Sequence, residues 1–192
     1  MNDCPVEVYQ NPGEFDQLLA RVRALAPTRV LEIGSMFGGT LWHWMHAAPR
    51  GATFIAVDML VSQSDPRYVA QKSGHDVVWA EWARELGHHL TIIADDSTRP
   101  DVVSYVRRIV EKVDFLFIDG GHSFECVLAD ITNYRPLVRP GGIMALHDID
   151  LRGSGVPDAW RQMTDPQGRD AAPVFEEFVE VSGDRGIGVV YL

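Results

Sequence analysis

Cysteine is scarce in this sequence, with Cys4 and Cys126 as the only two among its 192 residues. They lack the spacing of a metal-binding cysteine motif, which indicates free thiols in a reducing compartment. The first ten residues, MNDCPVEVYQ, show neither the basic nor the apolar part of a secretion signal. We therefore predict a cytoplasmic protein.

Long apolar runs and an excess of basic residues are also missing. The longest apolar runs have the length of a strand, as in residues 114–119 (DFLFID), so we expect no membrane-spanning segment and no membrane partner. Lysine and arginine number 17 against 27 aspartate and glutamate residues, giving a net charge of −10. Such an acidic surface disfavours a nucleic-acid backbone as partner. We expect a small molecule instead.

Short apolar segments alternate along the chain with segments of helical spacing. The expected strands are 28–35, 53–59, 90–97, 113–120, 143–149, 174–181 and 187–192. The expected helices are 14–26, 39–48, 76–87, 99–112, 123–138 and 155–163. This alternation predicts parallel strands with right-handed crossovers, and the short turn at 182–186 predicts a final hairpin. The fold class is α/β, a Rossmann-like doubly wound, mostly parallel seven-stranded sheet with a C-terminal antiparallel hairpin, in a single domain spanning 1–192.

The first five expected strands end on polar residues or glycine. These ends carry Gly34, Asp58, Asp95 with Asp96, Asp119, and His147 with Asp148. In open parallel sheets, ligands bind beyond the carboxyl ends of the strands. Acids at four of five consecutive strand ends are hard to explain as solvation alone, and they predict a binding site at this edge.

The first of these ends is a glycine turn, VLEIGSMFGG, which contains Gly34, Gly38 and Gly39. Glycines allow a sharp turn and a close approach to a ligand. Met36 stands where the dinucleotide fingerprint has its second glycine, while Asp58, 24 residues after Gly34, can accept bonds from ribose hydroxyls. The turn suits a ligand without a pyrophosphate. A plain tight turn followed by a solvated acid is the alternative.

Several motifs together resemble a class I S-adenosylmethionine-dependent methyltransferase. They are VLEIGSMFGGTLW, FIAVD, ADDS and the long segment FLFIDGGHSFECVLADITNYRPLVRPGGIMALHDI at 115–149. More narrowly, they resemble the branch that includes macrolide sugar O-methyltransferases and cephalosporin hydroxylase-like proteins. The resemblance covers residues 28–150, and its last segment is the most specific because the motif is dense and ordered.

The resemblance implies a role for each matching position. The methionine end of S-adenosylmethionine would meet Glu32 and the glycine turn, and Asp119 would lie close to the sulfonium. The full set implied for cofactor binding is Glu32, Gly34, Ser35, Gly38, Asp58, Asp96, Ser97 and Asp119. Within it, Asp58 would bind the ribose, while Asp96 and Ser97 would lie near the adenine.

A divalent cation is the second implied partner. Metal-using members of this branch hold it with an acid at the Asp119 position and an acidic pair after the fifth strand. Here that pair is His147 and Asp148, which departs from two carboxylates. The candidate ligands are therefore Asp119, His147 and Asp148. They would suit Mg²⁺ or Mn²⁺, with His147 favouring the transition metal.

His122 and Asp119 are the candidate catalytic residues. A histidine has a pKa near neutrality and can remove a proton from an alcohol, which is a poor nucleophile while protonated. The structural alternatives are that Asp119 caps the following turn or helix, and that His122 only braces that turn by bonding Asp119.

The leading interpretation is an enzyme that moves a methyl group to an oxygen of a small-molecule acceptor. A nicotinamide-dependent oxidoreductase and a non-catalytic binding module remain alternatives at this stage. Residues 60–87 are the expected lid over the acceptor, and a homodimer is another way to cover the site.

Overall fold

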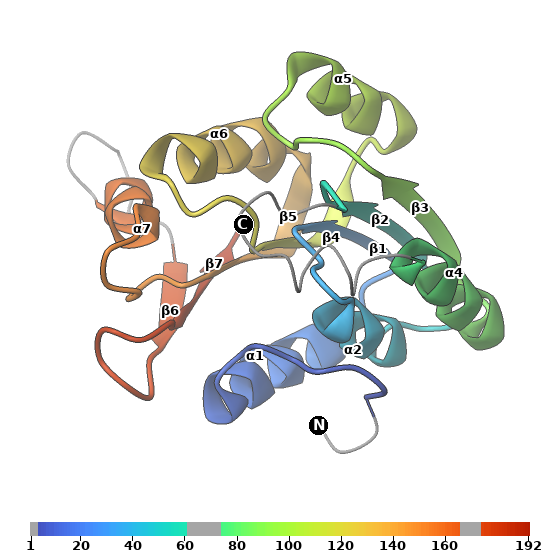
Figure 1. Cartoon of the computed structure of the whole chain (residues 1–192), viewed down its shortest axis with the longest axis horizontal. Coiled ribbons are helices and arrows are strands. Elements are labelled where there is room, and N and C mark those ends of the chain that lie inside the picture. Colours follow the sequence, from blue (N-terminus) through green and yellow to red (C-terminus); the bar gives the residue numbers. More distant parts are fainter. Residues whose placement is uncertain (1–3, 61–73, 166–173) are drawn as a thin grey trace.

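The computed structural model describes residues 4–60, 74–165 and 174–192, which build a seven-stranded sheet (Figure 1). The strands are β1 Arg29–Ile33, β2 Thr53–Val57, β3 His89–Ile93, β4 Val113–Ile118, β5 Val138–His147, β6 Val174–Phe178 and β7 Ile187–Tyr191. Their order is β3-β2-β1-β4-β5-β7-β6. The first five run parallel, and β7 pairs antiparallel with both β5 and β6. The predicted fold class is confirmed, including the C-terminal hairpin.

Helices cover both faces of the sheet (Figure 1). One face carries α1 Pro12–Leu25, α2 Gly39–Ala47 and α4 His75–Leu86, and the other carries α5 Pro100–Ile109, α6 Phe124–Tyr134 and α7 Val156–Thr164. Strand β4 shows why both faces need cover. Phe115 and Phe117 pack against Trp44 of α2, whereas Leu116 and Ile118 belong to the opposite core. Alternate residues of a strand point to opposite faces, so one continuous apolar run supplies two cores.

Two expected boundaries were wrong. Residues 139–142, which separate the expected helix 123–138 from the expected strand 143–149 and read as a turn, belong to β5, and the pairing register with β4 shifts between Val113 and Phe115 to accommodate them. The glycines in this stretch permit the bulge. The helix predicted over 123–138 ends at Tyr134 and continues as a 3₁₀ turn, Arg135–Leu137, because Pro136 has no N–H to donate.

Part of the expected lid, residues 61–73, lies outside the described residues. The second half of the expected lid contains α4, His75–Leu86, whose Trp79 is fully buried against the core. In the described ranges, no helix combines the length and the apolar character needed to cross a membrane.

Candidate active site

The turn between β1 and α2 depends on glycine at its first position. Gly34 has φ +81°, and a Cβ added there would lie 2.1 Å from the carbonyl oxygen of Asp119. The turn therefore packs directly against the end of β4, and no side chain fits between them. Met36, two residues on, also adopts a left-handed conformation at φ 51°, which a non-glycine residue rarely does. The backbone of this turn therefore has positive φ at both Gly34 and Met36.

Glu32 lies beneath this turn and is fully buried. Its carboxylate accepts hydrogen bonds from Thr40 Oγ1 at 2.6 Å, Ser35 Oγ at 2.8 Å and Trp44 Nε1 at 3.0 Å. Burial raises its pKa to about 7, and these three donors offset part of that rise. The structure thus places Glu32 as a brace that joins the turn to α2. Its predicted contact with the methionine end of a cofactor stays a prediction.

Asp58, at the end of β2, also faces the turn. Its Oδ2 accepts from the amides of Ser35 at 2.8 Å and Met36 at 2.9 Å, and its Oδ1 accepts from the amide of Leu60 at 2.7 Å. The acid predicted to bind ribose is thus next to the glycine turn, and it shapes the backbone there.

The third strand end lies beside a buried acid that sequence reasoning missed. Asp96 Oδ1 accepts from the amide and hydroxyl of Thr98, both at 2.8 Å, and Tyr134 donates to the carbonyl of Ser97 at 2.6 Å. Asp130 of α6 is 1% exposed, and neither of its oxygens has a hydrogen-bond partner within the described ranges. Burial raises its pKa to about 6, and nearby Ser97 offsets only part of the rise. Its position among the sheet-facing residues of α6 was the only available signal.

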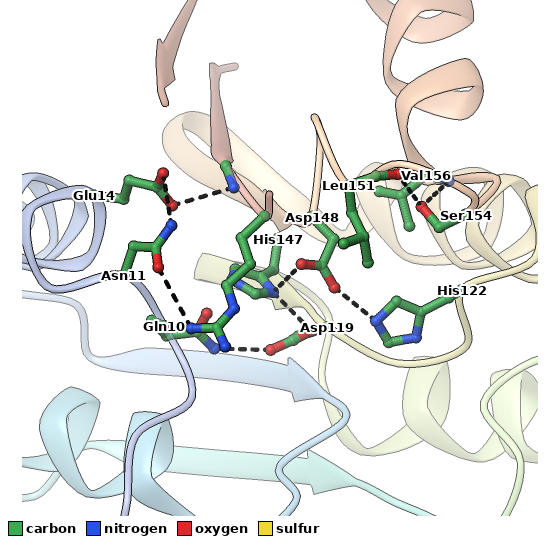
Figure 2. Close-up of polar contacts among 12 residues, drawn as sticks. Gln10, Asn11, Glu14, Asp119, His122, His147, Asp148, Leu151, Ser154 and Val156 are labelled. Carbon is green, nitrogen blue, oxygen red and sulfur yellow. Dashed lines mark hydrogen bonds and ion pairs between the residues drawn. The ribbon is translucent and has the colours of Figure 1, made fainter. Parts of the chain in front are cut away.

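The ends of β4 and β5 bring two acids and two histidines together (Figure 2). His122 Nε2 lies 2.6 Å from Asp148 Oδ2. His147 Nδ1 lies 3.2 Å from Asp119 Oδ1 and 3.1 Å from Asp148 Oδ1. We call Asp119, His122, His147 and Asp148 the rim cluster. Sequence reasoning predicted all four members, and the structure places them side by side.

The two histidines of the rim cluster differ in exposure. His147 is 5% exposed, while the side chain of His122 is 49% exposed and faces outward. Burial opposes a charge on His147, but Asp119 and Asp148 outweigh burial and raise its pKa to about 10. His147 is therefore an internal cation that holds two carboxylates together, and His122 is the histidine that a substrate can reach.

Asp148 supports both histidines from a strained backbone. Its φ is +63°, in the left-handed region. Burial would raise the pKa of its carboxyl, but the bonds from His122 and His147 outweigh burial and hold that pKa far below its usual range. The hydrogen bond to Asp148 in turn raises the pKa of His122 above 6.5, against the effect of burial. Asp148 is ionised and is fixed where it can orient His122.

One further contact to Asp119 comes from the N-terminal segment. Gln10 Nε2 donates to Asp119 Oδ2 at 2.9 Å, although the two residues lie 109 positions apart in the sequence. No local pattern could have indicated this contact. Asp119 is thus held from two sides, by Gln10 at one oxygen and by His147 at the other.

A cation could be held by part of the rim cluster. Ligand atoms of Asp119, His122 and Asp148 lie within 4.8 Å of one another, and a cavity of about 10 Å³, roughly the size of one water, is lined by these residues. Two carboxylates and an imidazole suit Mn²⁺ or Mg²⁺. The predicted set had His147 in place of His122. The geometry thus brings His122 to the two carboxylates as a nitrogen donor, and ligation by His147 stays a prediction.

The chain resembles known proteins along most of its length. Residues 31–149 match the sequence model of the family described as a methyltransferase domain. An uncharacterized protein of Sinorhizobium fredii is 25% identical over 169 residues, which cover 83% of this chain and 17% of that protein. A rhamnosyl O-methyltransferase of Mycobacterium leprae is 26% identical over 136 residues, 69% of this chain and 53% of that protein. The chain thus spans about half or less of the length of these relatives.

Solved structures share the fold. The O-methyltransferase TomG of Streptomyces achromogenes, crystallised with S-adenosylmethionine, superposes with a TM-score of 0.65 at 17% identity, covering 99% of this chain and 84% of that one. At this identity the likeness shows the fold alone. The match over 31–149 covers more than half of the 192 residues and confirms the resemblance drawn from the motifs. The chain belongs to the family of methyltransferase domains.

Proposed function

We propose that this chain transfers a methyl group from S-adenosylmethionine to a hydroxyl oxygen of a small molecule. The observation that carries the proposal is the pair His122–Asp148, set 2.6 Å apart beside Asp119 at the rim that the glycine turn touches. Membership of the methyltransferase domain family supports S-adenosylmethionine as the cofactor. The rim cluster supports a hydroxyl as the acceptor, because a hydroxyl must lose its proton in the reaction.

The reaction is an in-line displacement at the methyl carbon. The acceptor oxygen forms a bond to that carbon while the carbon–sulfur bond breaks, and the bonding pair moves to sulfur and neutralises the sulfonium. The hydroxyl proton must leave as the new ether forms. The protein therefore has to align the acceptor with the methyl group and provide a base for the proton.

His122 can be this base because Asp148 determines which nitrogen is free. A carboxylate only accepts hydrogen bonds, so the contact of His122 Nε2 with Asp148 requires the proton on Nε2 and leaves the lone pair on Nδ1. Nδ1 would take the hydroxyl proton, and Asp148 would stabilise the resulting imidazolium. His147 lies between Asp119 and Asp148 and offsets the negative charge of these two carboxylates.

A divalent cation would be held by Asp119 and Asp148 with one histidine. When bound, it would lower the pKa of the acceptor hydroxyl and fix its orientation. The Nε2 atom of His122 cannot ligate a cation and donate to Asp148 at the same time. Exhaustive chelation followed by addition of Mg²⁺ or Mn²⁺ separates the two uses: lost and restored turnover supports the cation, and unchanged turnover supports His122 with Asp148 alone.

The acceptor that we propose is a sugar hydroxyl. The support is the similarity to the rhamnosyl O-methyltransferase of Mycobacterium leprae, together with the half-exposed His122 at the rim. Sugar hydroxyls ionise only well above neutral pH, so such an acceptor needs the base that the rim cluster offers.

A screen with isotopically methyl-labelled S-adenosylmethionine tests the function. The panel would hold rhamnosides, other deoxysugar glycosides, sugar nucleotides and phenols, with NAD included in a parallel thermal-shift assay. We expect labelled product from at least one sugar and a melting shift with S-adenosylhomocysteine but not with NAD. A shift with NAD alone would contradict the proposal and favour the oxidoreductase.

Three wider expectations are part of the proposal. Residues 1–192 would act as one methyltransferase domain, and a homodimer would cover the acceptor site. Cytoplasmic location is supported by Cys4 and Cys126, which are both free thiols. Light scattering of the purified chain tests the dimer, and a monomer at the assay concentration would contradict it.

A further inference from the structure

The segment before α1 crosses the glycine turn. A Cβ added to Gly39 would lie 2.7 Å from the carbonyl oxygen of Glu7, so the segment packs onto the first residue of α2. The ring of Tyr9 lies 5.9 Å from that of Phe37, which belongs to the same turn. Figure 1 shows the N-terminal segment passing beside α2 before it enters α1. Its path thus runs over the turn predicted to receive the cofactor.

The far end of this segment is fixed to the C-terminal hairpin. Glu14 is fully buried, and its carboxylate accepts from the amides of Glu180 at 2.8 Å and Gly186 at 3.1 Å. Asn11 Nδ2 donates to the same carboxylate at 3.1 Å (Figure 2). Gln10 therefore lies between two anchored stretches, and its side chain has little freedom to move.

One end of the Gln10 side chain is satisfied and the other is not. The residue is 6% exposed, and its Nε2 donates to Asp119 Oδ2 at 2.9 Å. A carboxylate accepts only, so the amide nitrogen must face Asp119 and the carbonyl oxygen must point elsewhere. That Oε1 atom is buried and has no hydrogen-bond partner in the described part of the chain. Buried acceptors are nearly always paired, so this oxygen calls for a donor.

A cationic donor fits this position best, because the Asp119 carboxylate, bonded to the amide nitrogen of Gln10 at 2.9 Å, attracts a positive charge. S-adenosylmethionine has one cationic donor, the α-ammonium of its methionine part, with three N–H groups; its sulfonium carries no hydrogen and its carboxylate only accepts. We propose, resting on the function proposed above, that Gln10 is a cofactor-binding residue whose Oε1 accepts a hydrogen bond from this α-ammonium. Nε2 meanwhile keeps Asp119 turned toward the cofactor.

Calorimetry with two ligands tests the assignment without any acceptor present. The ligands are S-adenosylhomocysteine and its desamino analogue, which lacks only the α-amino group. The variant Gln10→Leu keeps the volume and removes the amide. We expect this variant to bind S-adenosylhomocysteine at least about tenfold more weakly than the wild type does, because it loses a hydrogen bond to a charged group. Its affinity for the desamino analogue should stay within about twofold of the wild-type affinity, because that ligand has no such bond to lose.

Controls separate this inference from folding and from the proposed function. Gln17→Leu changes an exposed glutamine of α1 that donates to the carbonyl of Gly13, and both affinities should stay at the wild-type value. Melting curves check each variant, and Gln10→Met replaces Gln10→Leu if the latter does not fold.

Other binding results would contradict either the proposed function or the role of Gln10. If the wild type binds no S-adenosylhomocysteine, the proposed function fails and this inference with it. If the wild type binds it and Gln10→Leu binds it equally well, only the inference fails. Equal losses of affinity for both ligands would show that Gln10 acts through Asp119 alone, which contradicts the proposal. An effect confined to the KM of the acceptor would assign Oε1 to the acceptor hydroxyl and would also contradict it.

Discussion

The glycine turn and the rim cluster each contain two carboxylates, but these carboxylates have different partners. In the turn, Glu32 and Asp58 accept from hydroxyl, indole and backbone donors that belong to the fold. In the rim cluster, Asp119 and Asp148 face histidines, which can gain and lose protons. The difference separates acids that shape a binding loop from acids that can support chemistry. Burial alone does not separate them, because Asp58 and Asp148 are buried to nearly the same extent.

The largest effect that we expect on the turn comes from Gly34→Ala. A side chain there must adopt a left-handed conformation and meet the Asp119 carbonyl, so we expect a loss of about 2–5 kcal/mol in the free energy of unfolding. Gly51→Ala is the matched control, since Gly51 has φ +88° with nothing within 4 Å of an added Cβ. It should lose only about 1–2 kcal/mol. Equal losses in denaturant melts would show that the close approach is unimportant.

Asp58→Ala should have the next largest effect. It leaves the amides of Ser35, Met36 and Leu60 without their acceptor, so we expect a loss of about 1–3 kcal/mol in stability. Affinity for S-adenosylhomocysteine should fall at least about tenfold, by calorimetry. Asp58→Asn, which keeps one acceptor oxygen, should give intermediate values. Full affinity with reduced stability would mean that Asp58 shapes the turn without binding ribose.

Asp130→Asn should have the smallest effect and the opposite sign. Burial raises the pKa of Asp130 from 3.8 to about 6, so the folded state holds its proton more tightly than the unfolded chain does. Its unfavourable contribution is absent below about pH 4 and complete above about pH 6. We therefore expect the variant to be more stable than the wild type by about 1–2 kcal/mol at neutral pH and equally stable near pH 4. A stability difference independent of pH would contradict this.

Local patterns predicted most of the fold and much of the site. Short apolar segments that alternate with segments of helical spacing predicted the strands. The end of a strand is a local feature of the sequence, so four residues of the site could be predicted from it: Asp58, Asp119, His122 and Asp148. The pairing of Gln10 with Asp119 joins residues 109 positions apart and leaves no local signal. The bulge in β5 was missed because Gly141 and Gly142 in the stretch 139–142 resemble a turn.

The inward position of His147 was also beyond sequence reasoning. Strand alternation gives the side of the sheet but not the neighbours, and the charge on His147 depends on two carboxylates from separate strand ends. The closeness of His122 to the two carboxylates, which adds it to the candidate metal set, likewise depends on the folded positions of two strand ends. The roles of these residues toward cofactor and cation stay predictions.

The central claim is that His122 removes the acceptor proton with Asp148 as its partner. The most direct test is the turnover of His122→Ala per folded molecule, measured with the acceptor from the screen and alongside calorimetry with S-adenosylhomocysteine. We predict that turnover falls about 10²–10⁴-fold while cofactor affinity stays unchanged. Wild-type turnover should also fall as pH drops through a pKa above 6.5, because the base must be neutral and its bond to Asp148 favours the charged form. A lower melting temperature with turnover per folded molecule nearly intact would contradict the account and leave His122 as a brace of the turn.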